Sequence, residues 1–133
     1  MDERRWDLCR YRIEQARESL KASKIMLENS MIKDSINRSY YSVFYAMKAV
    51  LTLEEKDFKR HKDVVAYFNK MYVATGTFPR ELGRMIAKLQ QLREKSDYDD
   101  FFVASITKAE QQIRTAENVI EKVECFINNY RIS

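Results

Sequence analysis

Turn-forming residues are scarce in this chain of 133 residues, which contains two Gly and one Pro. Charged residues, most of which are strong helix formers, make up 33% of the sequence. Few turn residues and many helix formers predict long helices with short connections. We therefore expect an all-α fold in a single helical domain over residues 1–133, long enough to bury a core without disulfides or metals.

Residues that support common catalytic motifs are also scarce. The chain has no Gly-rich phosphate loop and no nucleophile elbow, and its single histidine, His61, leaves no Glu-x-x-His pair for a di-iron bundle. Cys9 and Cys125 are too far apart in sequence for a metal or redox motif, and two lone cysteines fit a reducing cytosol. We expect no metal and no cofactor. Acid–base chemistry near neutral pH then requires His61, a perturbed carboxylate or a residue from a partner.

Long apolar runs are missing as well. No apolar run follows the charged residues at the start of the chain, so this segment does not resemble a secretory signal. The longest apolar-rich segment, residues 40–53, is interrupted by Lys48 and is too short to span a bilayer. We expect a cytoplasmic protein with no membrane association.

The positive charge is concentrated in the middle of the chain, although the net charge is only +4. Residues 56–95 contain ten Lys and Arg against four Asp and Glu, whereas the residues from 96 onward contain four against seven. A basic segment favours an anionic partner, but solvated helix faces produce the same bias about as often.

The spacing of apolar residues predicts five helices, at about 4–28, 32–53, 61–73, 79–95 and 107 to the end. Thr107 and Glu110 have the spacing of a capping box, and residues 97–102 are expected to form a non-helical elbow. Pro79 is expected in the first turn of the fourth helix. The last helix has the 3–4 spacing of a bundle seam at Ile113, Ala116, Ile120, Val123, Ile127 and Tyr130.

The second predicted helix has two distinct faces. Arg38, Tyr41 and Tyr45 lie at i, i+3 and i+7 and form one line, where a helix with only a core to fill usually has Lys, Glu or Gln. A guanidinium between phenol rings indicates a surface that contacts a second subunit, a nucleic acid or both. The other face is an apolar stripe of Ile36, Tyr40, Val43, Phe44, Met47, Val50 and Leu51.

Four segments in order, residues 37–47, 60–68, 72–78 and 96–99, resemble the HEPN domain of small prokaryotic proteins often encoded beside a minimal nucleotidyltransferase. The resemblance extends from Asp34 to the last helix. It implies an antiparallel up-and-down bundle of four main helices plus a short extra helix, usually homodimeric. It also implies RNA cleavage or nucleotide binding, commonly as the toxin whose antitoxin is the nucleotidyltransferase.

Active members of this family cleave RNA without metal through an Arg-x(4–6)-His motif that lines a cleft between two subunits. Arg38 matches the arginine, and Tyr45 stands after six intervening residues where the histidine is expected. A phenol has a reference pKa near 10, so it can donate a proton or stack on a base but is a poor general base. His61 either approaches Arg38 and replaces the missing base, or is a partly buried histidine at a helix start.

The remaining candidates also have two interpretations each. Arg38 either binds phosphate or pairs with Asp34 at i−4, and Tyr41 is a candidate for stacking on RNA bases. Because partner enzymes of the family can transfer AMP to a tyrosine near the motif, Tyr41 and Tyr45 are candidate acceptors. Arg80, Arg84 and Lys88, at i, i+4 and i+8, form either an RNA-phosphate track or a solvated helix face.

Three functions remain open from the sequence. The first is a metal-independent ribonuclease toxin that uses Arg38 with Tyr45 or His61. The second is a catalytically silent module that binds RNA or a nucleotide in the same cleft. The third is an interaction protein in which Arg38, Tyr41 and Tyr45 simply form the dimer interface. The missing histidine favours the second and third functions, whereas the arginine and the basic fourth helix favour the first two.

Overall fold

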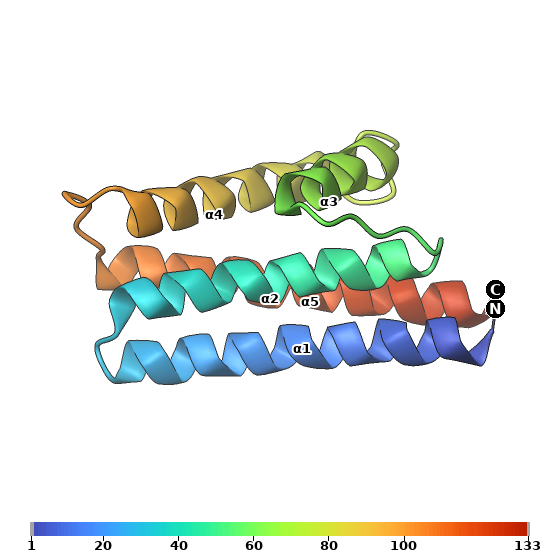
Figure 1. Cartoon of the computed structure of the whole chain (residues 1–133), viewed down its shortest axis with the longest axis horizontal. Coiled ribbons are helices and arrows are strands. Elements are labelled where there is room, and N and C mark those ends of the chain that lie inside the picture. Colours follow the sequence, from blue (N-terminus) through green and yellow to red (C-terminus); the bar gives the residue numbers. More distant parts are fainter. Residues whose placement is uncertain (1, 133) are drawn as a thin grey trace.

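The computed structural model describes residues 2–132, which form an all-α bundle without strands. Four long helices run up and down, antiparallel to their chain neighbours, and both chain ends lie at one end of the bundle (Figure 1). This architecture confirms the predicted fold class. In this part of the chain, no helix is both long and apolar enough to cross a membrane. The elements are α1 (Glu3–Glu28), α2 (Ile32–Thr52), α3 (His61–Phe68), the π-helix η1 (Asn69–Val73), α4 (Arg80–Tyr98) and α5 (Ile106–Ile132).

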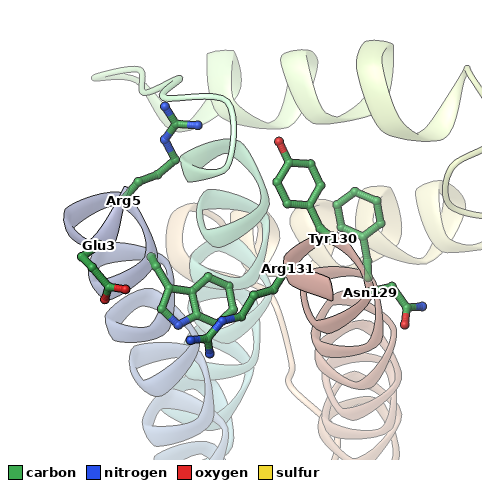
Figure 2. A pocket seen from close by; sticks show the side chains of 7 residues that line it. Glu3, Arg5, Asn129, Tyr130 and Arg131 are labelled. Atoms are coloured by element: carbon green, nitrogen blue, oxygen red, sulfur yellow. The ribbon is translucent and has the colours of Figure 1, made fainter. Parts of the chain in front are cut away.

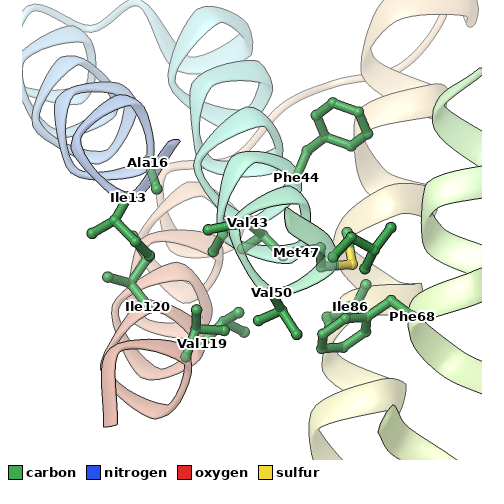
Figure 3. Packing of buried hydrophobic residues seen from close by; sticks show 14 of the residues in the cluster. Ile13, Ala16, Val43, Phe44, Met47, Val50, Phe68, Ile86, Val119 and Ile120 are labelled. Carbon is green, nitrogen blue, oxygen red and sulfur yellow. The ribbon is translucent and has the colours of Figure 1, made fainter. Parts of the chain in front are cut away.

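Helix α2 is the central helix of the bundle. It contacts α1, α3, α4 and α5, and Figure 1 shows it in front of α5, with α1 on one side and α4 on the other. Its side chains meet those of α1 and α5 in one direction and those of α3 and α4 in the other (Figure 3). The predicted apolar stripe is buried along its whole length, at Ile36, Tyr40, Val43, Phe44, Met47, Val50 and Leu51.

Small side chains line the contact between α1 and α2. Ser23 Oγ donates to the Ser35 carbonyl oxygen at 2.7 Å and lies 2.7 Å from Ser39 Oγ. Nearer the other end of the contact, Cys9 Sγ donates to the Ala49 carbonyl oxygen at 3.4 Å. All five residues are buried. Because small side chains separate two helices less than large ones, α1 packs closely along one edge of α2.

The start of α5 differs from the prediction. Ser105 Oγ accepts a hydrogen bond from the Lys108 N–H at 3.1 Å, so Ser105 caps the helix. The capping box predicted at Thr107 and Glu110 is therefore wrong, since both residues lie inside α5. The predicted seam of α5 is buried except for Tyr130, which is 41% exposed at the end of the bundle.

The third predicted helix changes from an α-helix to a π-helix after Phe68. It is α-helical in α3 and then widens to a π-turn in η1, where the Ala74 N–H donates to the Asn69 carbonyl oxygen at 2.8 Å. Gly83 of α4 faces this turn, because a Cβ atom at Gly83 would lie 2.9 Å from Val73 Cγ1. The glycine therefore allows α4 to approach η1.

Helix α4 begins and ends later than predicted. Pro79 occupies the N-cap position rather than the first turn. At the other end the helix continues to Tyr98, so the first two residues of the predicted elbow at 97–102 are helical. The extension adds a turn to α4 beside the first half of α2, where Asp97 accepts a hydrogen bond from Asn37 Nδ2 at 3.2 Å.

Candidate functional site

The outward edge of α2, which is formed by Arg38, Tyr41 and Tyr45, lies between α1 and the start of α3. Arg38, Tyr41 and Tyr45 are half-buried there. Arg38 and Tyr45 line a cavity together with residues of α1, and Tyr41 contacts His61 at the start of α3. The line of residues predicted from the sequence therefore has α1 beside Arg38 and Tyr45, and the start of α3 beside Tyr41.

Arg38 has no acidic partner in the described part of the chain. Its guanidinium lies over the Tyr41 ring, with 5.1 Å between the guanidinium carbon and the ring centroid. Its Nη2 donates to Ser19 Oγ of α1 at 3.5 Å, while its Nε is buried without a hydrogen-bond partner. The alternative pairing with Asp34 is not formed. The positive charge of Arg38 is therefore not neutralised by an ion pair, which favours contact with an anion.

Arg38 and Tyr45 line the same open cavity, whose volume is about 260 Å³. Glu18 of α1 also lines it, and this carboxylate was not predicted from the sequence. Nothing in the local sequence marks Glu18, because its place beside Arg38 depends on how α1 and α2 are aligned. The other lining residues are Gln15, Ser19 and Ala22.

Tyr41 connects Arg38 to His61. The Tyr41 and His61 rings meet edge to face, with centroids 5.5 Å apart and planes at 84°. The His61 ring also packs 4.2 Å from the Phe44 ring, centroid to centroid. His61 is partly buried at the start of α3 and contacts the Tyr41 ring rather than Arg38. Arg38, Tyr41 and His61 form one continuous group.

The surroundings of His61 favour its neutral form. Burial lowers the pKa of His61 below its usual 6.5, and the positive charges of Arg93 and Lys48 lower this pKa further. Near pH 7 the imidazole is therefore mostly unprotonated and has a lone pair that can accept a proton. This is the protonation state that a general base requires.

Arg93 of α4 is a second cation of the site, and it was not predicted from the sequence. Its guanidinium carbon lies 5.0 Å from the Tyr40 ring centroid and 5.7 Å from that of Tyr41. Its Nη2 donates to the Tyr41 hydroxyl at 3.5 Å, and its Nε lies 3.0 Å from Asp97 Oδ2. Arg93 therefore holds Tyr41 from the side opposite α1. In the sequence, the only indication that Arg93 faces α2 is its position four residues after the buried Leu89, on the apolar side of α4.

The basic row predicted on α4 does not reach this group. Arg80, Arg84 and Lys88 are exposed, and Arg84 forms an ion pair with Glu81 at 3.5 Å. At 100° per residue, the row lies on the side of α4 away from Arg93. The structure therefore separates the row from Arg38, Tyr41, Tyr45 and His61. No group of three or more His, Cys, Asp or Glu side chains in residues 2–131 is arranged to hold a metal ion.

Comparison with known proteins identifies the family of this bundle. The family model described as HEPN domain matches residues 9–126, which include all the site residues named above. The chain belongs to the HEPN domain family. The match confirms the family resemblance found in the sequence.

Relatives of this HEPN chain cover most of its length. "UPF0332 protein" of Thermotoga maritima is 31% identical over 116 residues, which are 87% of this chain and 88% of that protein. "Putative toxin MJ0605" of Methanocaldococcus jannaschii is 33% identical over 119 residues, 90% of this chain and 83% of that protein. "Putative toxin MJ0142" of the same organism is 32% identical over 116 residues, with coverage of 87% and 74%.

Proposed function

We propose that this HEPN protein is the toxin of a toxin–antitoxin pair and that it cleaves RNA at the outward edge of α2 without a metal ion. The observation that carries the proposal is the continuous group of Arg38, Tyr41 and His61. It combines an unpaired cation, an aromatic ring and a neutral imidazole. The toxin names of two relatives support the biological role.

Each residue has a defined part in the proposed reaction. Arg38 binds the phosphate and stabilises the negative charge that builds up on it. The ribose 2′-hydroxyl attacks the phosphorus and gives its proton to His61. The bond to the 5′-oxygen breaks, and the Tyr45 phenol protonates this leaving group. The products are a 2′,3′-cyclic phosphate and a 5′-hydroxyl, while Tyr41 holds a base by stacking.

A second copy of the chain completes the site in this proposal. Arg38, Tyr41 and Tyr45 are only partly buried in the single chain, and tyrosine and arginine are residue types enriched at protein interfaces. Two copies that join along α2 would form a shared cleft lined by both sets of residues. Sedimentation of the purified protein tests this, since a monomer at micromolar concentration contradicts the shared cleft.

The antitoxin in this proposal is a minimal nucleotidyltransferase. Such an enzyme would silence the toxin by moving AMP from ATP to a phenol of the site, releasing pyrophosphate. Tyr45 is the preferred acceptor because it lines the open cavity beside Arg38, whereas Tyr41 is enclosed by Arg38, His61 and Arg93. Mass spectrometry after co-expression should find AMP on wild-type protein and none on Tyr45→Phe.

A catalytically silent binding module is the second candidate function. Tyr45 in place of the motif histidine is the observation that favours it. In this case the same residues would hold RNA or a nucleotide without cleaving it. Binding of RNA that weakens with salt, together with intact RNA after long incubation, would identify the silent module.

Growth on induced expression tests the toxin role. Expression of the wild-type chain without its antitoxin should arrest growth, and Arg38→Ala should relieve the arrest. Arg114→Ala is a matched control, since Arg114 is an exposed arginine of α5 with no ion pair in the described residues. Equal growth of all three strains at equal protein levels would contradict the toxin role.

A further inference from the structure

The last turns of α4 make a polar contact with α2 beside the candidate site. The carboxylate oxygen Oδ2 of Asp97 lies 3.0 Å from Nε of Arg93 and accepts a hydrogen bond from Nδ2 of Asn37 at 3.2 Å. Arg93 and Asp97 are one helical turn apart on α4, whereas Asn37 belongs to α2 and directly precedes Arg38. The Asp97 carboxylate therefore ties Arg93 to the turn of α2 that carries Arg38.

Phenol rings surround the Arg93 guanidinium. Its carbon lies 5.0 Å from the ring centroid of Tyr40, 5.7 Å from that of Tyr41 and 6.0 Å from that of Tyr98. Only 16% of the Arg93 side chain and 27% of the Asp97 side chain are exposed. Asp97 is thus the counter-charge of a cation that water reaches only in part. Without a counter-charge, a cation in such surroundings is costly and moves toward water.

The position of this ion pair indicates more than helix stabilisation. An exposed pair one turn apart on a helix is an ordinary, weak contact. A partly buried pair also adds little stability, and apolar side chains often replace it without loss. What distinguishes this pair is that Arg93 Nη2 donates to the Tyr41 hydroxyl at 3.5 Å. The Tyr41 ring in turn packs on Arg38 and His61, so the pair acts on the centre of the site.

We propose that Asp97 is a positioning residue of the ribonuclease site, where it holds Arg93 against Tyr41 and so fixes the ring on which Arg38 and His61 pack. This role rests on the proposed function, but the arrangement of the side chains can be measured without RNA. Asp97 touches neither the RNA nor His61 in this proposal. Loss of its charge frees Arg93 to turn toward water and leaves Tyr41 without support on the α4 side.

An NMR titration of His61 distinguishes positioning from simple loss of charge. Burial and the charges of Arg93 and Lys48 lower the His61 pKa. The titratable groups that face His61 are Arg93 of α4 and Lys48, Tyr40 and Tyr41 of α2. If Arg93 stayed in place in Asp97→Asn, removal of a negative charge would lower the His61 pKa or leave it unchanged. If Arg93 turns away, the pKa rises. We expect the rise.

Two further variants and one fluorescence measurement serve as controls. Asp100→Asn removes the same charge from an exposed residue three positions later and should leave the His61 pKa unchanged. In an Arg93→Gln background, Asp97→Asn should not raise the pKa further, because the positioned cation is gone. Trp6, the single tryptophan, lines the pocket shown in Figure 2, at the other end of the bundle from Asp97. Its fluorescence should be the same in Asp97→Asn and wild type.

RNA cleavage measures the consequence for the reaction. Asp97→Asn should lower kcat about tenfold, as for loss of one hydrogen bond to a charged group, with little change in KM. Asp97→Glu keeps the charge and should recover part of this loss. Intact RNA with the wild type would contradict the ribonuclease, whereas the His61 titration would still decide the role of Asp97.

The titration has three results that overturn the positioning role. The first is a His61 pKa in Asp97→Asn that equals or lies below that of the wild type. The second is an equal rise in Asp100→Asn, which would make the effect one of general charge. The third is a further rise when Asp97→Asn is added to Arg93→Gln, since Asp97 would then act without Arg93.

Discussion

Tyr41 and His61 meet edge to face, with ring centroids 5.5 Å apart and ring planes at 84°. This contact joins α2 to the start of α3, although the two residues are 20 positions apart in sequence. Arg38 lies over the same Tyr41 ring, so one phenol connects the cation and the imidazole. A change in the charge or position of any of the three should affect the other two.

The first prediction concerns the pKa of His61, which a single NMR resonance reports because the chain has one histidine. Burial and the charges of Arg93 and Lys48 lower this pKa below 6.5. Arg93→Gln should raise the pKa toward 6.5, and Lys48→Gln should raise it less. Arg84→Gln on the far side of α4 should leave it unchanged. A His61 pKa at or above 6.5 in the wild type would contradict the described surroundings.

The same lowered pKa makes folding stability depend on pH. The unfolded chain binds the His61 proton more readily than the folded chain, because its pKa is the usual 6.5. The stability that comes from keeping His61 neutral in the folded chain is therefore fully present above about pH 6.5. It decreases as the pH falls through and below this value. Denaturant titrations at pH 7.5 and 5.5 should show a smaller loss of stability in His61→Gln than in the wild type.

The second prediction concerns the salt dependence of RNA binding. Each phosphate contact to a single strand contributes about 0.7 to the slope of log affinity against log salt. Arg38→Gln should therefore reduce the slope by about 0.7 and weaken binding at every salt concentration. Arg114→Gln should not change the slope. An unchanged slope in Arg38→Gln would remove Arg38 from the phosphate contacts.

The basic row of α4 gives a third prediction. If Arg80, Arg84 and Lys88 follow the RNA backbone outside the cleft, replacing all three by Gln should reduce the slope by about 2. Because the row lies away from Arg38, the cleavage position in the RNA should stay the same. A slope equal to that of the wild type would identify the row as an ordinary solvated helix face.

The cap of α5 gives a fourth prediction. Ser105→Ala removes the hydrogen bond from the Lys108 N–H to Ser105 Oγ and should cost about 1 kcal/mol of the free energy of unfolding. Thr107→Ala is the matched control and should change stability much less, because Thr107 lies inside the helix. A larger loss in Thr107→Ala than in Ser105→Ala would restore the capping box predicted from the sequence.

The contact of Gly83 with Val73 gives a fifth prediction. Gly83→Ala brings a Cβ atom to 2.9 Å from Val73 Cγ1 and should destabilise the wild type by about 1 kcal/mol or more. In a Val73→Ala background the same substitution should stabilise by about 1 kcal/mol, because alanine is the better helix former. Urea denaturation of the four proteins measures this coupling. If the stability changes of Gly83→Ala and Val73→Ala simply add in the double variant, Gly83 is not what allows α4 to approach η1.

The core of α2 could be predicted because it depends only on spacing along one helix. Its stripe from Ile36 to Leu51 is buried throughout. Its other face, with Arg38, Tyr41 and Tyr45, was also visible in the sequence. Glu18 and Arg93 were not, because their places beside α2 depend on how α1 and α4 are aligned against it.

The helix ends were predicted less well, because neighbouring residues offer alternative ways to begin or end a helix. Both Ser105 and Thr107 have side chains that can cap a helix, and only the helix start shows that Ser105 does so. The π-turn of η1 has no recognised sequence signal, since its residues fit an α-helix equally well. Tyr130 keeps the seam spacing of α5, but α5 ends there and leaves the ring exposed.

Cleavage of a labelled RNA by the purified protein in EDTA tests the central claim most directly. We expect fragments with 2′,3′-cyclic phosphate ends from the wild type and from Arg114→Ala. Arg38→Ala and His61→Gln, each shown to be folded by circular dichroism, should not cleave. Intact RNA with the wild type, or cleavage by His61→Gln at the wild-type rate, would contradict the proposed ribonuclease site.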